Sequence, residues 1–322
     1  MLSDSEDIYC EDGTPIPDCE DFHPRRDDYC VEALLQHGRL SRVVVSRRRG
    51  DGEQLFTVKV ASKFYGNKRI DCSRELEALN LVQGCNFLLN LRDFFETNLF
   101  YYIVTDYYPG FSLQRLVESH APLLLPEHLV KFYAAELLLA VDTLHKKGGI
   151  HRDVKPNNVV LDEEGHVVLL DYGMVVFPKR DGHEKTLIRG TSHFIPPEVF
   201  DRQPFDHTAD WWSYALTCYY LATGKRAFAP HSTDISVISR AVRTQEPDLH
   251  GASGDFLQLL TALLHKDPHQ RLGRYGAEQI QAHSYFADVD WTKMAEKACT
   301  PPLSPAEHYG AEYVRLPPLE DD

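Results

Sequence analysis

Three carboxylate or amide side chains and one lysine lie at spacings suited to handling a phosphate. The segment IHRDVKPNN covers residues 150–158 and supplies Asp153, Lys155 and Asn158, and Asp171 follows in the tripeptide DYG. At such a site an aspartate positions and deprotonates an acceptor hydroxyl, and a lysine neutralises charge on the transferred phosphate. An asparagine and a second aspartate offer the oxygen ligands that magnesium prefers. The pattern therefore predicts a phosphoryl-transfer site.

The neighbouring sequence predicts the elements that position these side chains. Apolar residues recur at helical spacing across 129–144, which predicts a buried amphipathic helix ending shortly before His151. Two short apolar runs within 159–170 flank the turn sequence DEEG and predict a hairpin. Because Asn158 and Asp171 lie at opposite ends of this hairpin, we expect both to reach a single metal ion.

The composition is that of an ordinary globular protein. The 322 residues are 43% hydrophobic and 25% charged, enough for one large domain or two lobes. The net charge of -14 argues against a nucleic-acid partner. Residues 1–30 hold ten acids against Arg25 and Arg26 and so supply -8 of that charge. We expect residues 1–29 to form a disordered acidic arm, because charge repulsion outweighs the little apolar surface there.

Cysteine usage and hydropathy bear on the compartment. The seven cysteines include no C-x-x-C pair, which favours reduced thiols over a disulfide framework or a zinc site. No apolar run approaches the roughly 20 residues of a membrane span. The acidic start is neither a secretory signal nor an arginine-rich transit peptide. We therefore expect a cytoplasmic or nuclear protein without a membrane span.

The motif at 150–158 and the DYG tripeptide resemble the catalytic loop and the metal-binding motif of eukaryotic protein kinases, with Tyr172 where the family usually has Phe. The resemblance implies an α+β, bilobal protein kinase fold over residues 30–286. The small lobe, 30–106, is expected to hold an antiparallel β-sheet with one main helix. The larger lobe, 107–286, is expected to be mainly helical.

Two further segments resemble the AGC group of protein kinases, the relatives of cyclic-AMP-dependent kinase. The sequence DWWSY, starting at Asp210, looks like the start of that group's central large-lobe helix. In the family this aspartate accepts backbone hydrogen bonds from the catalytic loop. The run HSYF at 283–286 and the prolines after it resemble the beginning of the AGC tail, which would occupy 287–322 as a short segment.

The resemblance also implies a set of nucleotide-binding residues. The β-rich run FTVK ends at Lys59 and looks like the strand whose lysine contacts the α and β phosphates of ATP. That lysine needs a glutamate partner, for which Glu75 is the first candidate and Glu77 the second. Asp106 lies at the expected hinge, where backbone groups receive adenine.

The loop that covers the phosphates departs from the family pattern. The family has G-x-G-x-x-G-x-V, whereas this chain has QHGRLSRV over residues 36–43. The resemblance implies that Gln36, His37, Gly38 and Val43 bind ATP, although only the middle glycine and the valine match the family pattern. The side chains at 36 and 41 are expected to stiffen the loop or hold it away from the nucleotide. A pseudokinase acting as a binding module therefore stays open as an alternative, and a small-molecule phosphotransferase is a third.

The segment GTSHFIPPE, residues 190–198, resembles the one that closes a kinase activation loop. By that resemblance Thr191 hydrogen-bonds near Asp153 and Lys155, as in Ser/Thr-directed members. Glu198 is expected to pair with Arg271. Removing one member of such a buried pair leaves an uncompensated charge that costs about 3 to 5 kcal/mol.

The resemblance also implies a regulatory contact between the catalytic loop and the activation loop that precedes residue 190. Arg152 occupies the position that pairs with an activation-loop phosphate in many family members. Thr186 is the nearest acceptor in this sequence. Our hypothesis is that a phosphate on Thr186 orders the loop against Arg152.

Substrate choice is expected to differ from that of typical AGC kinases. These select arginine before the target Ser or Thr through acidic residues, and the matching positions here are Ser112, Asn157 and Tyr220. The absent carboxylates remove most of the electrostatic preference for a basic substrate. The resemblance thus predicts a monomeric Ser/Thr protein kinase that uses ATP and Mg²⁺, acts on protein substrates and is not strongly Arg-directed.

Overall fold

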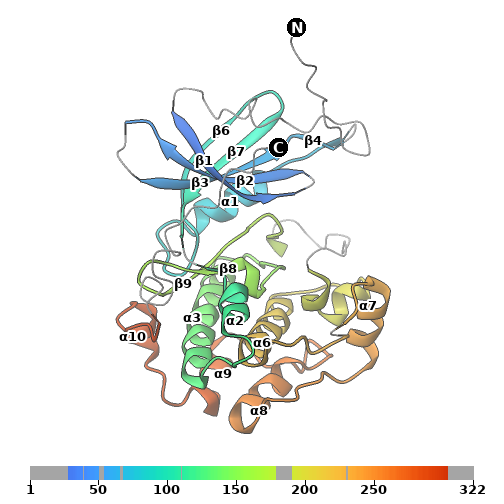
Figure 1. Ribbon diagram of the computed structural model, residues 1–322. Coiled ribbons are helices and arrows are strands. Elements are labelled where there is room, and N and C mark those ends of the chain that lie inside the picture. Colours follow the sequence, from blue (N-terminus) through green and yellow to red (C-terminus); the bar gives the residue numbers. More distant parts are fainter. Residues whose placement is uncertain are drawn as a thin grey trace. The chain divides into compact units, whose positions relative to one another are not determined.

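The computed structural model divides into two compact units (Figure 1). It describes residues 28–38, 40–50, 54–65, 68–109, 111–178, 191–229 and 231–303. Within that part of the chain, the first unit contains residues up to 80 and from 90 to 107. The second contains residues 81–89 and those from 108 onward.

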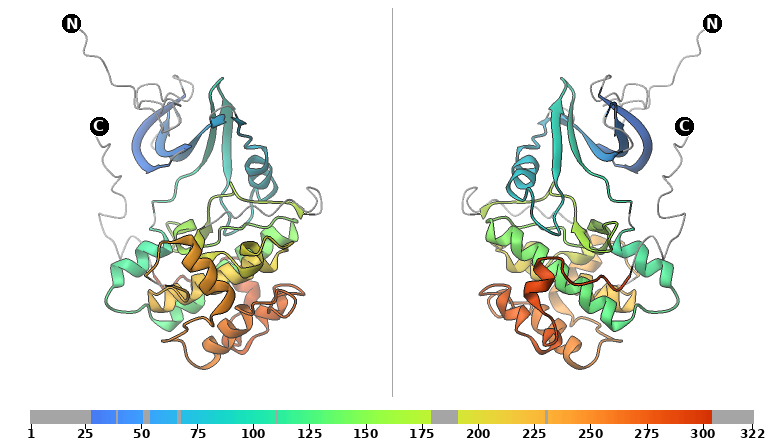
Figure 2. Two further views of the ribbon diagram at one scale, coloured as in Figure 1. Left: turned by 90° about the vertical axis from the view of Figure 1, so that its right-hand side faces the viewer. Right: turned by 90° about the vertical axis from the view of Figure 1, so that its left-hand side faces the viewer.

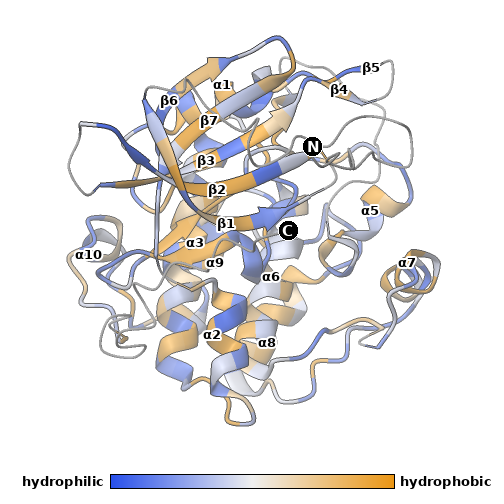
Figure 3. Ribbon diagram, turned by 45° about the horizontal axis from the view of Figure 1, so that its top comes forward, coloured by the Kyte–Doolittle hydropathy of each residue, from blue (hydrophilic) through white to orange (hydrophobic). Residues whose placement is uncertain are grey.

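The first unit is built on a five-stranded antiparallel sheet with the order β1-β2-β3-β7-β6. Alternating apolar residues account for it, because period-two patterning buries one face of each strand. Figure 3 shows β2 hydrophobic in its middle and hydrophilic at its ends. The large strands are β1 (Tyr29–His37), β2 (Ser41–Arg48), β3 (Leu55–Ser62), β6 (Leu91–Glu96) and β7 (Phe100–Asp106), and a separate pair comprises β4 (Phe64–Tyr65) and β5 (Lys68–Arg69).

The register of this sheet places Lys59 of β3 opposite Val43 of β2 and Ile103 of β7. The lysine is therefore held on a central strand with a paired neighbour on each side. The buried face beneath the sheet is a cluster of apolar side chains: Tyr29, Val44, Phe56, Val58, Val60, Phe95, Tyr102 and Val104.

The helix α1 (Ser73–Leu81) lies on one side of this sheet (Figure 2). Asp71 starts it by accepting hydrogen bonds from the Ser73 amide at 2.9 Å and the Ser73 hydroxyl at 2.7 Å. These bonds lower the pKa of Asp71. A carboxylate that satisfies amides at a helix N-terminus stabilises the first turn. The turn that it fixes contains Glu75.

The described part of the second unit is mainly helical and includes a short hairpin. Its helices are α2 (Leu113–His120), α3 (Glu127–Lys146), α5 (Pro197–Phe200), α6 (Thr208–Thr223), α7 (Ile235–Thr244), α8 (Gly254–Leu263), α9 (Glu278–Gln281) and α10 (Trp291–Ala295). The hairpin pairs β8 (Val159–Leu161) with β9 (Val167–Leu169). The unit also contains the 3₁₀ turns η1 (Pro156–Asn158), η2 (Ser192–Phe194) and η3 (Ser284–Phe286).

The core of the second unit is formed around α6. Trp211, Trp212 and Tyr214 have no exposed surface, and the helix packs against α3. Gly273 has φ +89°, and a Cβ at this position would lie 2.6 Å from Trp211 Cδ1. Only glycine allows the backbone to approach the indole so closely. This packing fixes the N-terminal turn of α6, which carries Asp210.

The segment 81–89 belongs to the second unit because it is bonded to the hairpin. The Leu169 amide donates to the Phe87 carbonyl at 2.8 Å, and the Leu89 amide donates to the Leu169 carbonyl at 3.3 Å. The chain therefore enters the second unit at residues 81–89 and returns to the first unit before the boundary expected near residue 106. This assignment of residues 81–89 depends on hydrogen bonds to Leu169, a distant residue that local sequence patterns do not reveal.

The expected α+β fold, with an antiparallel sheet and a helical part, is confirmed. The helix expected at 129–144 is α3, and the expected hairpin is β8–β9. The expected acidic arm lies almost entirely outside the described residues, as does the chain after residue 303. No helix in the described ranges has the length and hydropathy to cross a membrane.

Candidate active site

The catalytic loop is anchored by a carboxylate from α6. Both oxygens of Asp210 accept backbone hydrogen bonds, from the amides of His151 and Arg152, each at 2.8 Å. His145 Nε2 donates to the same carboxylate at 2.7 Å. The loop is thereby held with Arg152 at φ +71°, a conformation that non-glycine residues seldom adopt. Three hydrogen bonds to a single buried group therefore fix the start of the loop.

The ionisation of Asp210 follows from these contacts. Complete burial raises the pKa of Asp210. The hydrogen bond and charge of His145 lower it, as do the contacts with His151 and Arg152, and together they leave the pKa below its ordinary value. Because the pKa is lower in the folded chain, the ionised group contributes stability at every pH above the ordinary carboxyl pKa. That stability is lost only as the pH falls through the lowered value. The anchor is thus fully charged at neutral pH.

Asp153 is the most heavily bonded carboxylate of the site and is 2% exposed. Its Oδ1 accepts the Thr191 amide at 3.0 Å and the Thr191 hydroxyl at 3.2 Å. Its Oδ2 accepts from Lys155 Nζ at 2.6 Å and from Asn158 Nδ2 at 3.0 Å. The Lys155 ammonium also donates to the Thr191 hydroxyl at 2.6 Å. The expected grouping of Asp153, Lys155 and Thr191 is therefore present.

Asn158 is oriented by the same loop. Its amide nitrogen donates to both the carbonyl and the carboxylate of Asp153, which commits the nitrogen and leaves the side-chain oxygen as the atom suited to ligate a cation. The Asn158 carbonyl accepts the Leu170 amide at 2.8 Å, at the end of the hairpin. The hairpin thus brings the residue before Asp171 into direct contact with Asn158.

Asp171 lies in a tight backbone turn with φ +61°, and its Oδ1 accepts the Gly173 amide at 3.3 Å. The next residue, Tyr172, is buried beside the His151 ring, whose centroid is 5.6 Å from that of the tyrosine. Burial raises the pKa of Tyr172 far above that of a free tyrosine. Tyr172, which stands where the family usually has Phe, therefore packs in the core and helps to fix the position of Asp171.

The donor set offered by Asn158 and Asp171 suits magnesium. In the described ranges, no cluster of three or more His, Cys, Asp and Glu side chains could hold a metal ion. Magnesium binds through one or two protein oxygens and completes its shell with water and phosphate oxygens, so one amide and one carboxylate fit it. The pair does not suit a metal that requires a full shell of protein ligands.

The first unit contributes a second charged pair. Lys59 Nζ lies 2.7 Å from Glu75 Oε1, so the lysine pairs with the first of its two candidate partners. The side chains are 24% and 12% exposed, which keeps the lysine accessible while limiting its mobility. Sequence reasoning expected this pairing from the family pattern and from the position of α1.

The segment that replaces the glycine-rich loop is held together by the described residues on either side of position 39. The Gly38 amide donates to the Ser41 carbonyl at 2.8 Å, and Gln36 pairs in register with Val43. A Cβ at position 38 would lie 3.1 Å from the Ser41 carbonyl oxygen, a close contact that favours glycine here. The side chains of Gln36 and His37 are exposed. The loop is thus closed by its own backbone without the two other glycines of the family pattern.

Asp106 ends β7, and its side chain is engaged within the first unit. Arg92 Nη2 donates to Asp106 Oδ2 at 3.0 Å, and the Asp106 amide donates to the Asn90 carbonyl at 3.3 Å. The ion pair commits the carboxylate. The Asp106 amide is also committed, so the backbone carbonyl is the backbone group of this residue that can contact a nucleotide.

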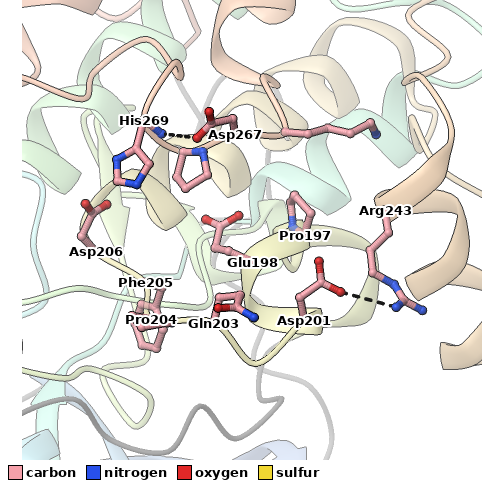
Figure 4. Close-up of a pocket in the computed structure, with 12 residues that line it drawn as sticks. Pro197, Glu198, Asp201, Gln203, Pro204, Phe205, Asp206, Arg243, Asp267 and His269 are labelled. Atoms are coloured by element: carbon pink, nitrogen blue, oxygen red, sulfur yellow. Dashed lines mark hydrogen bonds and ion pairs between the residues drawn. The ribbon is translucent and has the colours of Figure 1, made fainter.

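A buried ion pair joins two distant segments of the second unit. Arg271 donates to both oxygens of Glu198, at 2.7 and 2.9 Å, and also to the Thr208 carbonyl at 2.9 Å. Both side chains are buried. Glu198 also lines a pocket of about 670 Å³, where Asp201 and Arg243 form a second and more exposed pair (Figure 4). The pair expected between Glu198 and Arg271 is therefore present.

One expected site residue lies outside the described residues, and two contacts at the site were not predicted. Thr186 falls within 179–190, outside the described residues. The Arg152 guanidinium lies 5.0 Å from the centre of the Phe205 ring, a contact that the sequence did not predict. His145 was also missed, because a histidine at a helix end gives no local signal of a partner 65 residues away.

Comparison with known proteins gives a consistent result. Residues 29–286 match the family described as "Protein kinase domain". The chain is 32% identical over 293 residues to the serine/threonine-protein kinase sck2 of Schizosaccharomyces pombe, covering 87% of this chain and 44% of that protein. It is 33% identical over 291 residues to ribosomal protein S6 kinase 2 alpha of Xenopus laevis, covering 87% and 39%.

A third relative matches over more of its own length. The RAC family serine/threonine-protein kinase homolog of Dictyostelium discoideum is 29% identical over 299 residues, which cover 92% of this chain and 66% of that protein. The chain spans about two fifths of the length of the first two relatives.

Replacing Arg271 by alanine should destabilise the fold strongly. It leaves the Glu198 carboxylate buried and unpaired, which should lower the free energy of unfolding by about 3 to 5 kcal/mol. The matched control is Arg243→Ala, which removes an arginine from a pair whose members are 42% and 46% exposed. That change should cost about 1 kcal/mol or less. Urea denaturation of both variants measures the difference, and equal effects would contradict a structural role for the buried pair.

Proposed function

The chain belongs to the protein kinase family, and from that premise we propose that it is a serine/threonine protein kinase that transfers the γ-phosphate of ATP to protein hydroxyls. Its relatives support an AGC type, the group that its DWWSY segment resembles. The observation that carries the proposal is the Asp153 carboxylate, which Lys155, Asn158 and Thr191 hold in one orientation.

In this proposal Asp153 accepts the proton of the substrate hydroxyl and directs its oxygen at the phosphate. Its buried position and four hydrogen bonds fix the carboxylate before substrate arrives, so little reorganisation is needed. The Lys155 ammonium, 2.6 Å from Asp153, stabilises negative charge on the phosphate during transfer.

The remaining residues bind the nucleotide. Asn158 and Asp171 would hold Mg²⁺, which supplies electrostatic stabilisation of the phosphate oxygens. Lys59, held by Glu75, would contact the α and β phosphates, and the backbone at Asp106 would receive adenine. Gln36, His37, Gly38 and Val43 would cover the phosphates in a hairpin stiffer than the family's usual loop.

The contact between Lys155 and Thr191 favours a serine or threonine acceptor. Resemblance assigns this lysine and threonine to Ser/Thr-directed members, and here the two groups are hydrogen-bonded to each other and to Asp153. A binding module without turnover is the alternative. It draws support only from the departure at residues 36–43.

The proposal predicts magnesium-dependent transfer of phosphate from ATP to mixed protein substrates by the purified chain. Asp153→Asn should lower kcat by about 100-fold or more, because the acceptor of the hydroxyl proton is lost. Lys59→Met should also abolish most activity. Asp255→Asn and Lys147→Met are the matched controls, since both residues are exposed and lie outside the site, and each should retain wild-type rates.

Two results would contradict this assignment. Full activity of Asp153→Asn would remove Asp153 from catalysis. Nucleotide binding by the wild type, measured as a nucleotide-dependent rise in Tm, without any transfer would favour the binding module.

Thr186 is the proposed activating phosphorylation site. A phosphate there would pair with Arg152 and order the segment that follows the DYG motif. The Thr186→Ala enzyme should therefore lose most activity relative to phosphorylated wild type, as measured by initial rates on the same substrates. Equal rates for the two enzymes would contradict the regulatory role.

A further inference from the structure

The surface beside the catalytic loop lacks carboxylates at the three positions that matter for basic substrates. Ser112 caps α2 and bridges to Val160, two residues after Asn158. Asn157 is exposed in the turn η1 itself, and Tyr220 is half-buried near the end of α6. Both α2 and α6 contact η1. The two helices also contact each other (Figure 1). The three residues therefore lie on elements that border the catalytic loop.

Arg226 places a positive charge close to Tyr220, because the Gly224 amide donates to the Tyr220 carbonyl at 2.8 Å and Arg226 follows two residues later. Arg226 is exposed. Burial and then the Glu118 charge raise the pKa of Tyr220, and the Arg226 charge acts in the opposite direction. On the other side, burial and then the Arg226 charge lower the pKa of His193. His193 Nε2 contacts the Ala229 carbonyl at 3.4 Å, which brings η2 against the chain just after Arg226.

Arg115 places a second positive charge beside Ser112. Its backbone amide donates to the Ser112 hydroxyl at 3.3 Å, and its guanidinium lies 3.8 Å from the centre of the Phe111 ring. The Phe111 carbonyl accepts the Leu161 amide at 3.4 Å, which ties this ring to the strand after the catalytic loop. Stacking on an aromatic ring orients a guanidinium and leaves its edge available for an anion.

The charges of these arginines are not neutralised by the described part of the chain. Within those ranges, neither Arg115 nor Arg226 forms an ion pair. Lys225 adds a third exposed cation, and Glu118 is an opposing carboxylate, which Gln114 Nε2 holds at 2.9 Å. Asp248, whose amide donates to the Ala227 carbonyl at 2.8 Å, is a second opposing carboxylate. Arg115, Lys225 and Arg226 still outnumber Glu118 and Asp248, so the group keeps a net positive charge in a chain whose net charge is -14. Such a local reversal of charge attracts anionic partners to one place.

We propose that Arg115 and Arg226 select protein substrates that carry a carboxylate or a phosphorylated side chain shortly before the acceptor serine or threonine. The inference rests on the proposed kinase function and names its substrate class. Arginine suits this role because its planar guanidinium makes paired hydrogen bonds to carboxylates and phosphates. The site thus reverses the preference for basic substrates instead of only losing it.

The test measures kcat/KM for four serine peptides that differ only in the residues before the acceptor: Gln, Glu, phosphoserine or Arg. Wild type should prefer the Glu peptide to the Gln peptide by about fivefold, and the Arg peptide should be poorest. A much larger preference for phosphoserine would identify previously phosphorylated proteins as the source of the anion. Equal rates with Glu and phosphoserine would identify acidic sequences.

Charge-reversal variants distinguish a local effect of these two arginines from an effect of the overall charge of the protein. Arg226→Glu and Arg115→Glu should each lower the ratio of Glu-peptide to Gln-peptide kcat/KM by about fivefold. Lys147→Glu, an equal charge change at an exposed residue at the end of α3, should leave that ratio unchanged. Raising the salt concentration should reduce the ratio in wild type, because surface charges are screened.

The outcomes also separate this inference from the function on which it rests. Transfer to the Gln peptide with no preference for Glu or phosphoserine, or with a preference for Arg, would overturn the inference and leave the kinase function standing. A ratio that falls as much in Lys147→Glu as in Arg226→Glu would also overturn it. No transfer to any peptide or to mixed proteins would overturn both.

Discussion

The buried carboxylate of Asp210 is the constraint on which the rest of the site depends. A carboxylate without exposed surface is costly unless hydrogen bonds replace its water. Here two loop amides and the His145 imidazole supply them, each within 2.8 Å. The same hydrogen bonds also satisfy the backbone amides of His151 and Arg152, which would otherwise lack an acceptor in the protein interior. A loop that would otherwise sample many conformations is therefore held in one, including the unusual backbone of Arg152.

From this anchor the catalytic groups follow as a chain of contacts. His151 Nε2 donates to the Leu170 carbonyl at 3.0 Å, next to Asp171. Asn158 accepts the Leu170 amide and donates to Asp153, so the two ends of the hairpin are tied to one loop. Thr191 then binds Asp153 from the segment that leads to Glu198. The centre keeps the family pattern, whereas the surface at Arg115 and Arg226 departs from it, which separates the chemistry from the choice of substrate.

The sequence predicted those parts of the site whose signals are local. The helix before His151 and the hairpin between Asn158 and Asp171 follow from periodicity over a few residues, and both are present. The pairing of Lys59 with Glu75 needed the family pattern to choose between two nearby glutamates. The contact between His145 and Asp210 could not be predicted, because it joins residues 65 positions apart and neither residue type indicates the other. The proximity of Arg226 to His193 likewise depends on packing between distant segments, as the contact of His193 with the Ala229 carbonyl shows.

Amide hydrogen exchange at His151 and Arg152 tests the anchoring role of Asp210 most directly. At neutral pH the wild-type chain should protect both amides, because both are bonded to an ionised and buried acceptor. In Asp210→Asn one oxygen is replaced by an NH₂ group that cannot accept a hydrogen bond, so exchange at one or both amides should accelerate by about tenfold or more, equivalent to about 1.4 kcal/mol. Amides in the middle of α3 should keep their wild-type protection. Unchanged protection of His151 and Arg152 in the folded variant would contradict the account.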